Sequence, residues 1–255
     1  NKKMGKYFTV EVKPTIAASK QGGFVDGDAL FDWTSFKIPR GAARLVSVTG
    51  VFRGENGTPQ VKPKVDLYFG KAIDGTAPPT IGTLNAGVTA APLFTNHVIG
   101  MHHIMDTDSG QNAGDFWNIN QSGGGATGNQ IPGVVLQGNN TVDGDHAFDT
   151  IYVAAAAGNT IDFGTSVLVK GAVTADNSTT ISTDDGSAGD PNAEVIFAAG
   201  DVLHTASDEV IGTVSSIAAF GSGAQVITLT ANNVDALSDN DEIFNINPIR
   251  LIFSF

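Results

Sequence analysis

Residues 44–53 read Arg-Leu-Val-Ser-Val-Thr-Gly-Val-Phe-Arg, and apolar and polar side chains alternate along much of this stretch. Successive side chains of an extended chain point to opposite faces, so Val46, Val48 and Phe52 share one face. A repeat of two residues is typical of a strand with one buried face, whereas a helix repeats every 3.6 residues. The stretch therefore predicts a β-strand. This alternation indicates the fold class because it recurs along the chain.

The pattern returns first in residues 62–70, where Val65, Leu67 and Phe69 fall on one face and Asp66 and Tyr68 on the other. The segment between the two stretches contains an Asn-Gly pair at 56–57. Asn-Gly tolerates the positive φ angles of tight hairpin turns. The sequence therefore predicts that the two strands pair as an antiparallel hairpin.

Other segments also predict β-strands, and no run of 11 or more residues shows convincing helical periodicity. A long polar loop is expected after residue 105, including Asn118–Gln130. The further strands predicted in the first two thirds of the chain are Tyr7–Val12, Ala29–Ile38, His97–Met105 and Ile151–Ala155.

From about residue 167 the apolar segments become short and evenly spaced, with glycine, serine, asparagine and aspartate between them. Five or six short strands in about 80 residues predict a small closed barrel of SH3-like type. Closure is favourable because it leaves few unpaired strand edges. The strands expected here are Val167–Val173, Glu194–Phe197, Val202–His204, Val210–Ile217, Gln225–Thr230 and Asp241–Phe244.

The last segment, Ile249–Phe255, is longer and more apolar than its neighbours, and it resembles the strands of the first part of the chain. We expect it to return to the N-terminal sheet, so that the barrel is an insertion. The sequence thus predicts an all-β chain: an antiparallel β-sandwich or jelly-roll-like domain with an SH3-like β-barrel inserted near the C-terminus. The predicted domains are 1–165 plus 246–255 for the sandwich and 166–245 for the barrel.

Positive charge is concentrated in the first part of the chain. Of the 14 lysine and arginine residues, 12 lie between Lys2 and Lys71, where six acidic residues leave a formal charge of +6. The rest of the chain has 2 basic and 20 acidic residues, a formal charge of −18, and the whole carries −12. Such a division steers partners of opposite sign. It indicates one end that docks and another that faces solvent.

Composition also excludes several classes of function. Cysteine is absent, so disulfides, thiolate metal sites and cysteine nucleophiles are ruled out. No stretch approaches the roughly 20 apolar residues that span a bilayer, so no membrane partner is expected. The acidity of the whole chain argues against nucleic acid as a main partner, because phosphate binding needs a basic surface.

The search for catalytic or metal-binding motifs predicts no catalytic residue, no cofactor and no metal. Neighbouring His102 and His103 point to opposite faces of a strand, so they cannot share one ion. Asp143-Gly144-Asp145-His146 is read as a polar turn. The segment from Asp106 opens like a calcium loop, but its fifth and twelfth positions are Gly110 and Trp117. The acidic stretch 184–194 is read as a solvated loop, with adventitious calcium as the alternative.

Two stretches resemble structural proteins of tailed bacteriophage particles, especially those of marine cyanophages. One is residues 31–45, Phe-Asp-Trp-Thr-Ser-Phe-Lys-Ile-Pro-Arg-Gly-Ala-Ala-Arg-Leu, followed by 65–69. The other is residues 199–205, Ala-Gly-Asp-Val-Leu-His-Thr, with 211–214 and 226–230. Together they cover about a third of the chain. The resemblance implies a non-enzymatic component present in many copies in a virus particle.

Together with the charge division, this resemblance leads to the expectation of a capsid decoration or cement protein at the particle surface. Its partner would be the major capsid protein or another virion protein, and it would itself be a homo-oligomer, with a trimer as the first expectation. The residues expected to dock on the shell are Lys2, Lys3, Lys6, Tyr7, Phe8, Arg40 and Arg44.

Three other functions remain open from the sequence. The protein could belong to the phage tail or baseplate instead of the capsid. A glycan-binding β-protein would expose an aromatic platform at Trp117 or Tyr152, although core packing is the expected role of Trp33 and Trp117. A polysaccharide depolymerase would need two carboxylates at a defined separation, and the sequence selects no such pair.

Overall fold

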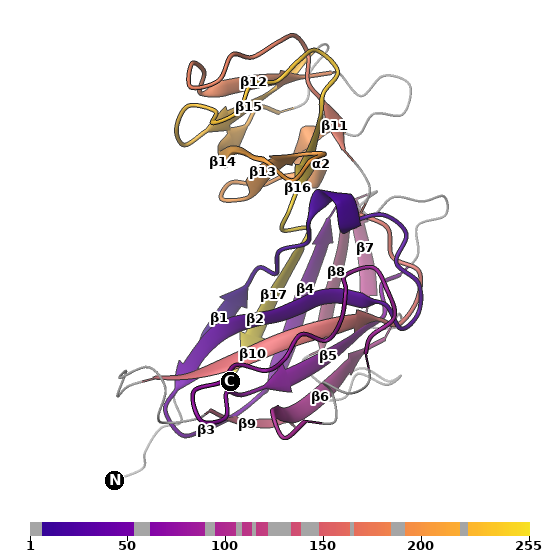
Figure 1. Cartoon of the computed structure of the whole chain (residues 1–255), viewed down its shortest axis with the longest axis vertical. Coiled ribbons are helices and arrows are strands. Elements are labelled where there is room, and N and C mark those ends of the chain that lie inside the picture. The colour runs from indigo at the N-terminus through magenta and orange to yellow at the C-terminus, as the bar shows by residue number, and fades with distance from the viewer. Residues whose placement is uncertain are drawn as a thin grey trace.

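The computed structural model describes residues 7–53, 62–89, 95–105, 109–113, 116–121, 134–138, 148–163, 166–184, 192–219 and 224–255, with backbone alone for 109–113 and 116–121. The chain is almost entirely β, as the sequence predicted. Figure 1 shows an elongated molecule with a large two-sheet body at one end and a small barrel at the other.

The large body is a sandwich of two antiparallel sheets. One has the order β1 (Thr9–Val12), β17 (Ile249–Ser254), β4 (Ser47–Arg53), β8 (Phe116–Gln121) and β7 (Ser109–Ala113). The other has the order β2 (Ala29–Pro39), β10 (Phe148–Ala157), β5 (Val65–Gly70) and β6 (Val98–Ile104). The strand order within the two sheets is that of a jelly roll, with β5 and β6 adjacent in one sheet and β7 and β8 adjacent in the other. The prediction of a jelly-roll-like sandwich is confirmed.

The core of the sandwich lies between these sheets and is built by the alternation that the sequence shows. Val65, Leu67 and Phe69 of β5 all point inward and are buried. Phe253 of β17 reaches from the opposite sheet, and its ring centre lies 5.5 Å from that of Phe69 and 5.3 Å from that of Phe36. Aromatic contacts of this kind hold the two sheets together across the core.

The predicted hairpin of residues 44–53 and 62–70 is wrong. Both segments contain the expected strands, but β4 pairs with β17 and β8, whereas β5 pairs with β10 and β6. The two strands therefore belong to opposite sheets. Each has a buried apolar face, and facing each other across the core satisfies both faces at once. Alternation predicts that a face is buried but does not say in which sheet. The Asn56-Gly57 pair lies outside the described residues.

The long polar loop expected after residue 105 is also wrong in part. Within it, β7 and β8 pair with each other, and β8 pairs with β4. The residues of β7, Ser-Gly-Gln-Asn-Ala, have low strand propensity. Backbone hydrogen bonding to β8, which itself pairs with β4, overrides this preference. Residues 122–130 of the expected loop lie outside the described part of the chain.

Between β10 and β17 the chain forms the barrel. Its sheet order is β11 (Val167–Leu168), β16 (Glu242–Asn245), β13 (Val202–Thr205), β14 (Val210–Ile217), β15 (Gln225–Leu229) and β12 (Thr180–Thr183). Backbone bonds join its two edges, because Lys170 N donates to Ser182 O at 2.8 Å and Asp184 N to Leu168 O at 2.9 Å. The sheet is thus nearly closed around its own core.

Two details of the barrel differ from the expectation. The segment around Glu194 is a single helical turn, α2 (Ala193–Ile196), instead of a strand. Ala193 and Ile196, three residues apart, are both buried, as residues on one face of a helical turn are, whereas residues three apart in a strand point to opposite faces. Strand β12 was not predicted, because its sequence Thr-Ile-Ser-Thr contains only one apolar residue. None of the helices in the described ranges is long and apolar enough to cross a membrane.

Strand β17 returns to the sandwich, as predicted, and lies between β1 and β4. The barrel is therefore inserted between β10 and the last strand of the sandwich. The barrel and the sandwich have separate hydrophobic cores.

Candidate functional site

The end of the sandwich farthest from the barrel carries exposed basic and apolar side chains. We call Tyr7, Arg40, Arg44, Val135 and Phe148 the basal surface. Tyr7 is 85 % exposed, Val135 55 % and Phe148 44 %, and both arginines are exposed as well. Figure 1 shows the strands that bear these residues, or end next to them, at the end opposite the barrel.

Strand pairing gathers these residues from distant parts of the sequence. Phe8 and Phe255 exchange two backbone hydrogen bonds, and Val46 N donates to Ser254 O at 2.8 Å. These bonds bring the N-terminal strand, the C-terminal strand and the segment after Arg44 to the same end. In the other sheet, Phe148 pairs with Pro39, the residue before Arg40.

A small two-stranded sheet forms part of this end. Strand β3 (Ala42–Arg44) pairs with β9 (Val135–Gln137), and the register places Arg44 opposite Val135. The middle residues, Ala43 and Leu136, are buried in the sandwich core. Because side chains alternate along a strand, Arg44 and Val135 then lie on the outer face.

Close packing holds this small sheet in place. A Cβ atom on Gly100 of β6 would lie 2.5 Å from Val134 Cγ1, and one on Gly138 would overlap the Asp149 side chain. Only glycine permits such close approach. The Asp149 carboxylate is buried and accepts a hydrogen bond of 3.2 Å from the backbone N–H of Gly41. Gly41 has a φ of 109°, which favours glycine in the turn between β2 and β3.

The residues expected to dock therefore differ in where they lie and in how exposed they are. Arg40, Arg44 and Tyr7 are exposed at the basal end, whereas Lys2, Lys3 and Lys6 lie outside the described residues. The Phe8 ring stacks on Phe255 with 4.9 Å between ring centres, and it packs against the core. This packing gives Phe8 a structural role.

Sequence reasoning missed Val135 and Phe148. Alternation from the inward-facing Ile151 and Val153 places Phe148 on the outer face, but the predicted strand began only at Ile151. Val135 belongs to a strand of three residues, which is too short for alternation to reveal.

A second candidate is a cleft of about 280 Å³ between the sandwich and the barrel. Asp201 of the barrel lies at its centre, and its carboxylate is only 5 % exposed. One carboxylate oxygen, Oδ2, accepts hydrogen bonds from Ala198 N at 2.8 Å, Asn245 Nδ2 at 3.0 Å and Arg53 Nη1 at 3.1 Å. The other, Oδ1, lies 3.5 Å from the Lys13 ammonium.

Further bonds cross this junction. Ile16 N donates to Ile246 O at 2.8 Å, and the buried Gln21 amide donates to Ile16 O and Asn245 O at 2.8 and 2.7 Å. Ser19 Oγ donates to Asp208 Oδ2 at 2.9 Å. The charged groups of the cleft are already engaged with one another, so the cleft serves to join the two units. We assign it a structural role.

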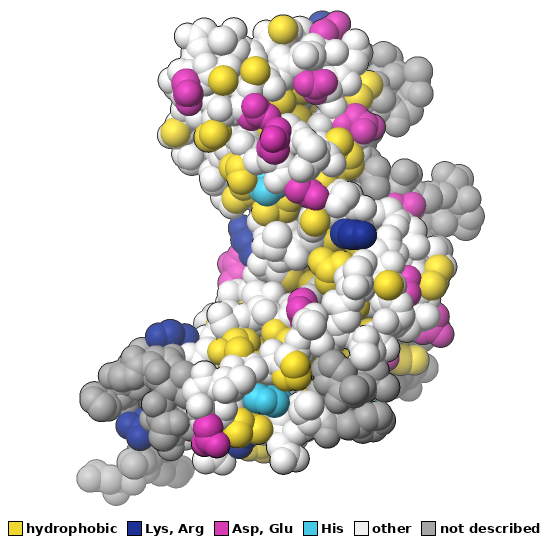
Figure 2. Space-filling model, in the orientation of Figure 1, with side chains coloured by type: hydrophobic (Ala, Val, Ile, Leu, Met, Phe, Trp, Pro, Cys, Tyr) yellow, Lys and Arg dark blue, Asp and Glu magenta, His cyan; other side chains and the backbone are white. Residues whose placement is uncertain are grey.

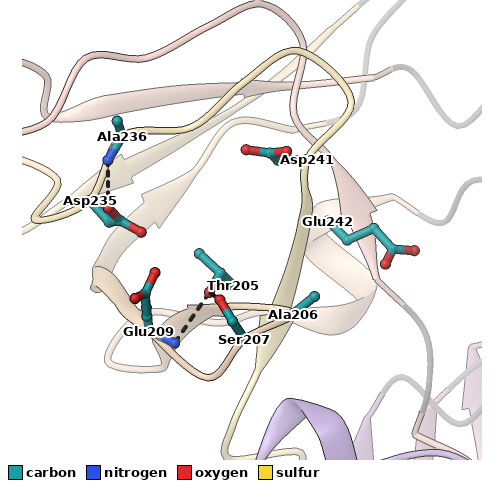
Figure 3. A pocket seen from close by; sticks show the side chains of 8 residues that line it. All are labelled: Thr205, Ala206, Ser207, Glu209, Asp235, Ala236, Asp241 and Glu242. Carbon is teal, nitrogen blue, oxygen red and sulfur yellow. Dashed lines mark hydrogen bonds between the residues drawn. The ribbon is translucent and has the colours of Figure 1, made fainter.

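A third candidate is an acidic pocket of about 480 Å³ on the barrel, drawn in Figure 3. The carboxylates of Glu209 and Asp235 point toward each other on one side, and that of Asp241 lies across the pocket. The pKa of Glu209 is raised above 4.5 by its interaction with Asp235. Hydrogen bonding to the Asp235 side chain is the larger cause, and repulsion by the Asp235 charge is the next. Glu242 points away and accepts a hydrogen bond from Ser166 Oγ at 3.0 Å.

A depolymerase would need two carboxyl groups about 5 Å or more apart. In this pocket the pKa of Glu209 is raised by its interaction with Asp235, which indicates that these two carboxyl groups lie near each other (Figure 3). Within the described ranges no three histidine, aspartate or glutamate side chains gather as a metal site. Of the acidic stretch 184–194, residues 185–191 lie outside those ranges, as does Asp143-Gly144-Asp145-His146.

The histidine pair lies on the edge strand β6. His103 is opposite Asp66 on β5, and its Nδ1 lies 2.6 Å from Asp66 Oδ1. His102 is opposite the inward-facing Leu67, so the two rings are on different faces, as the alternation predicted. The same outer face carries Tyr68, whose pKa is raised above 10.0 by burial and then by the Asp66 carboxylate.

The aromatic residues considered for glycan binding are not strongly exposed where the structure describes them. Trp33 is half-buried under the segment after β5, and its Nε1 donates to Pro79 O at 2.8 Å. Tyr152 is half-buried as well. The Trp117 side chain lies outside the described part of the structure.

Charge separates the two ends of the molecule. Residues 166–245 contain 12 acidic side chains and one lysine, a formal charge of −11, which leaves −1 of the total −12 for the rest of the chain. In Figure 2 acidic side chains gather over the barrel, and lysine and arginine lie mainly over the sandwich. No family model matches the chain, and a search of curated proteins found no match.

Proposed function

We propose that this protein is a non-enzymatic structural component of a tailed-phage particle, a capsid decoration or cement protein that binds the outer shell through its basal end. The observation that carries the proposal is the arrangement of charge and exposed apolar groups. Arg40 and Arg44 lie with exposed Tyr7 and Phe148 at one end, and a barrel segment of charge −11 lies at the other. The resemblance of residues 31–45 and 199–205 to phage structural proteins adds to it.

The arrangement suits a protein that docks on one side and faces solvent on the other. Arginine and aromatic side chains are enriched in protein interfaces, where they provide much of the binding energy. The acidic barrel would point away from the shell, and its charge would keep neighbouring particles from associating. The junction around Asp201 would hold the barrel in that orientation.

Attachment to a symmetric shell would strengthen binding through many copies. An oligomer on such a shell engages several sites at once, so weak contacts of each copy add up. We therefore propose a homo-oligomer, with a trimer as the first choice, and the major capsid protein as the partner. The tail or baseplate of the same particle is the alternative location.

The test is to purify particles of the phage that encodes the chain and to measure its copy number against the major capsid protein. Hundreds of copies, with antibody labelling over the head, would support a shell protein. A handful of copies with labelling at the tail would move the protein to the tail. Absence of the chain from purified particles would contradict the whole proposal.

A second experiment addresses the N-terminal lysines. A variant that lacks residues 1–6 should bind particles more weakly than the full chain, because the deletion removes the positive charges of Lys2, Lys3 and Lys6, which precede Tyr7 in the sequence. The weakening should be largest at low ionic strength, where charge attraction is least screened. Unchanged occupancy at low salt would remove these lysines from the interface.

A further inference from the structure

The β3–β9 sheet at the basal end is a supported surface, not a loop. Its inner residues, Ala43 and Leu136, are part of the sandwich core. Its outer face presents Arg44 and Val135 side by side, because they are opposite residues in the register. A strand pair with one face in the core and one in solvent presents its outer side chains at fixed positions.

Three close contacts keep this surface from moving. Gly100 of β6 lies against Val134, Gly138 lies against Asp149, and the Gly41 N–H is bonded to the Asp149 carboxylate. These contacts fix β9 on both sides and also fix the turn that carries Arg40. A surface held in its bound shape loses little conformational freedom on binding, which favours affinity.

The chemistry of the surface defines its partner. Arg40 and Arg44 are exposed here, and the buried Asp149 carboxylate accepts a hydrogen bond from the Gly41 backbone N–H. Val135 and Phe148 add exposed apolar area at the same end of the molecule. An arginine guanidinium binds carboxylates through two parallel hydrogen bonds. The fitting surface is therefore one with carboxylates around an apolar recess.

We propose that the outer face of β3–β9, with Phe148, is the central contact of the docking interface, and that it binds an acidic protein surface of the particle with an apolar recess. The inference rests on the proposed function, and it names the contact within the basal end that matters most. The N-terminal lysines then contribute long-range attraction, whereas Arg44, Val135 and Phe148 make the close contact.

The test compares matched variants for binding to purified particles that have been stripped of the protein. Arg44→Glu and Val135→Asp should each weaken binding at least about tenfold, as central interface residues do. Lys170→Glu reverses an exposed charge on the barrel, and Val25→Asp changes another valine that is 55 % exposed, away from the basal end. These two controls should bind like the unchanged protein. Thermal unfolding of each variant separates loss of binding from loss of folding.

The conservative variant Arg44→Lys keeps the charge but loses the paired geometry of the guanidinium, so it should fall between the unchanged protein and Arg44→Glu. If the full chain binds particles and the two basal variants bind equally well, the central contact is elsewhere and the proposed function stands. If the chain is absent from particles, both proposals fall together.

A second copy is the competing occupant, because the barrel is itself acidic. Light scattering after size-exclusion chromatography, at low and physiological salt, examines this directly. Self-association that Arg44→Glu abolishes, and that a barrel variant with neutralised Asp235 and Asp239 also abolishes, would overturn the proposal in favour of contact between copies. An unchanged mass for Arg44→Glu, together with its loss of particle binding, supports it.

Discussion

The buried carboxylate of Asp201 should be a main support of the junction between the sandwich and the barrel. Its Oδ2 accepts three hydrogen bonds, one of them from Arg53 of the sandwich, and its Oδ1 faces Lys13. The exposed pair of Glu11 and Arg250 in the same cleft provides a comparison. That pair is bidentate, with N–O distances of 2.8 and 3.0 Å, but both side chains are 40 % exposed.

The expected magnitudes follow from burial and geometry. Asp201→Ala removes the acceptor of three donors and leaves the Arg53 guanidinium, 18 % exposed, without its partner. Breaking a buried ion pair in this way costs about 3–5 kcal/mol. Asp201→Asn can keep an oxygen at the Oδ2 position, so the three bonds persist without charge, and we expect a loss of about 2 kcal/mol. Glu11→Gln should cost less than about 1 kcal/mol, because exposed pairs contribute little.

Urea unfolding at pH 7 measures these differences with two signals. Both tryptophans and all three tyrosines lie outside residues 166–245, so fluorescence follows the sandwich, whereas circular dichroism follows the whole chain. In the unchanged protein the two signals should change together, and in Asp201→Ala the barrel should unfold first. The reasoning is refuted if Glu11→Gln destabilises as much as Asp201→Asn, or if Asp201→Ala leaves both curves unchanged.

Three further predictions concern other parts of the molecule. Gly138→Ala should lower the free energy of unfolding by about 1–3 kcal/mol, because a Cβ there would overlap Asp149. Gly87→Ala is the control, because a Cβ at Gly87 meets no neighbour. Equal losses of stability for the two variants in thermal unfolding would contradict the close packing at Gly138. Asp235→Asn should lower the pKa of Glu209 toward 4.5, as measured by NMR titration of its carboxyl group. Since folding raises that pKa, the contribution of Glu209 to stability is present below about pH 4.5 and is lost as the pH rises through the folded value; an unshifted Glu209 titration in the variant would exclude the pairing. Deleting β17 should abolish folding of the sandwich, because β1 would lose its sheet partner and β4 one of its two; native-like circular dichroism after the deletion would show that the sheet can close without it.

Several features of the fold could be read from the sequence because they depend on local periodicity. The alternation in residues 65–69 identified the buried face of β5, and the apolar run 249–255 identified a strand that belongs with the sandwich. The spacing of short segments after residue 167 indicated the barrel. In each of these cases, burial of one face of a strand leaves a repeat of two residues in the sequence.

The pairing of strands could not be read in the same way. Backbone hydrogen bonds carry no information about side chains, so the alternation of β4 fits pairing with β5 as well as with β17. The polar β7 became a strand only because β8 offered partners, and α2 replaced an expected strand because four residues suit either structure. The candidate site depends on the same long-range pairing: Val135 meets Arg44, and Phe148 meets Pro39, only after the jelly roll closes.

The sequence alone determined that this chain is an all-β protein with its positive charge in the first part and its negative charge in the rest. Only the tertiary structure decided that β4 and β5 face each other across the core, that Asp201 joins the barrel to the sandwich, and that arginine and apolar side chains meet at the basal end. The physical reason is that composition and periodicity are properties of neighbouring residues. Contacts between residues far apart in the sequence are set by which pairing buries every apolar face and satisfies every buried polar group at the same time.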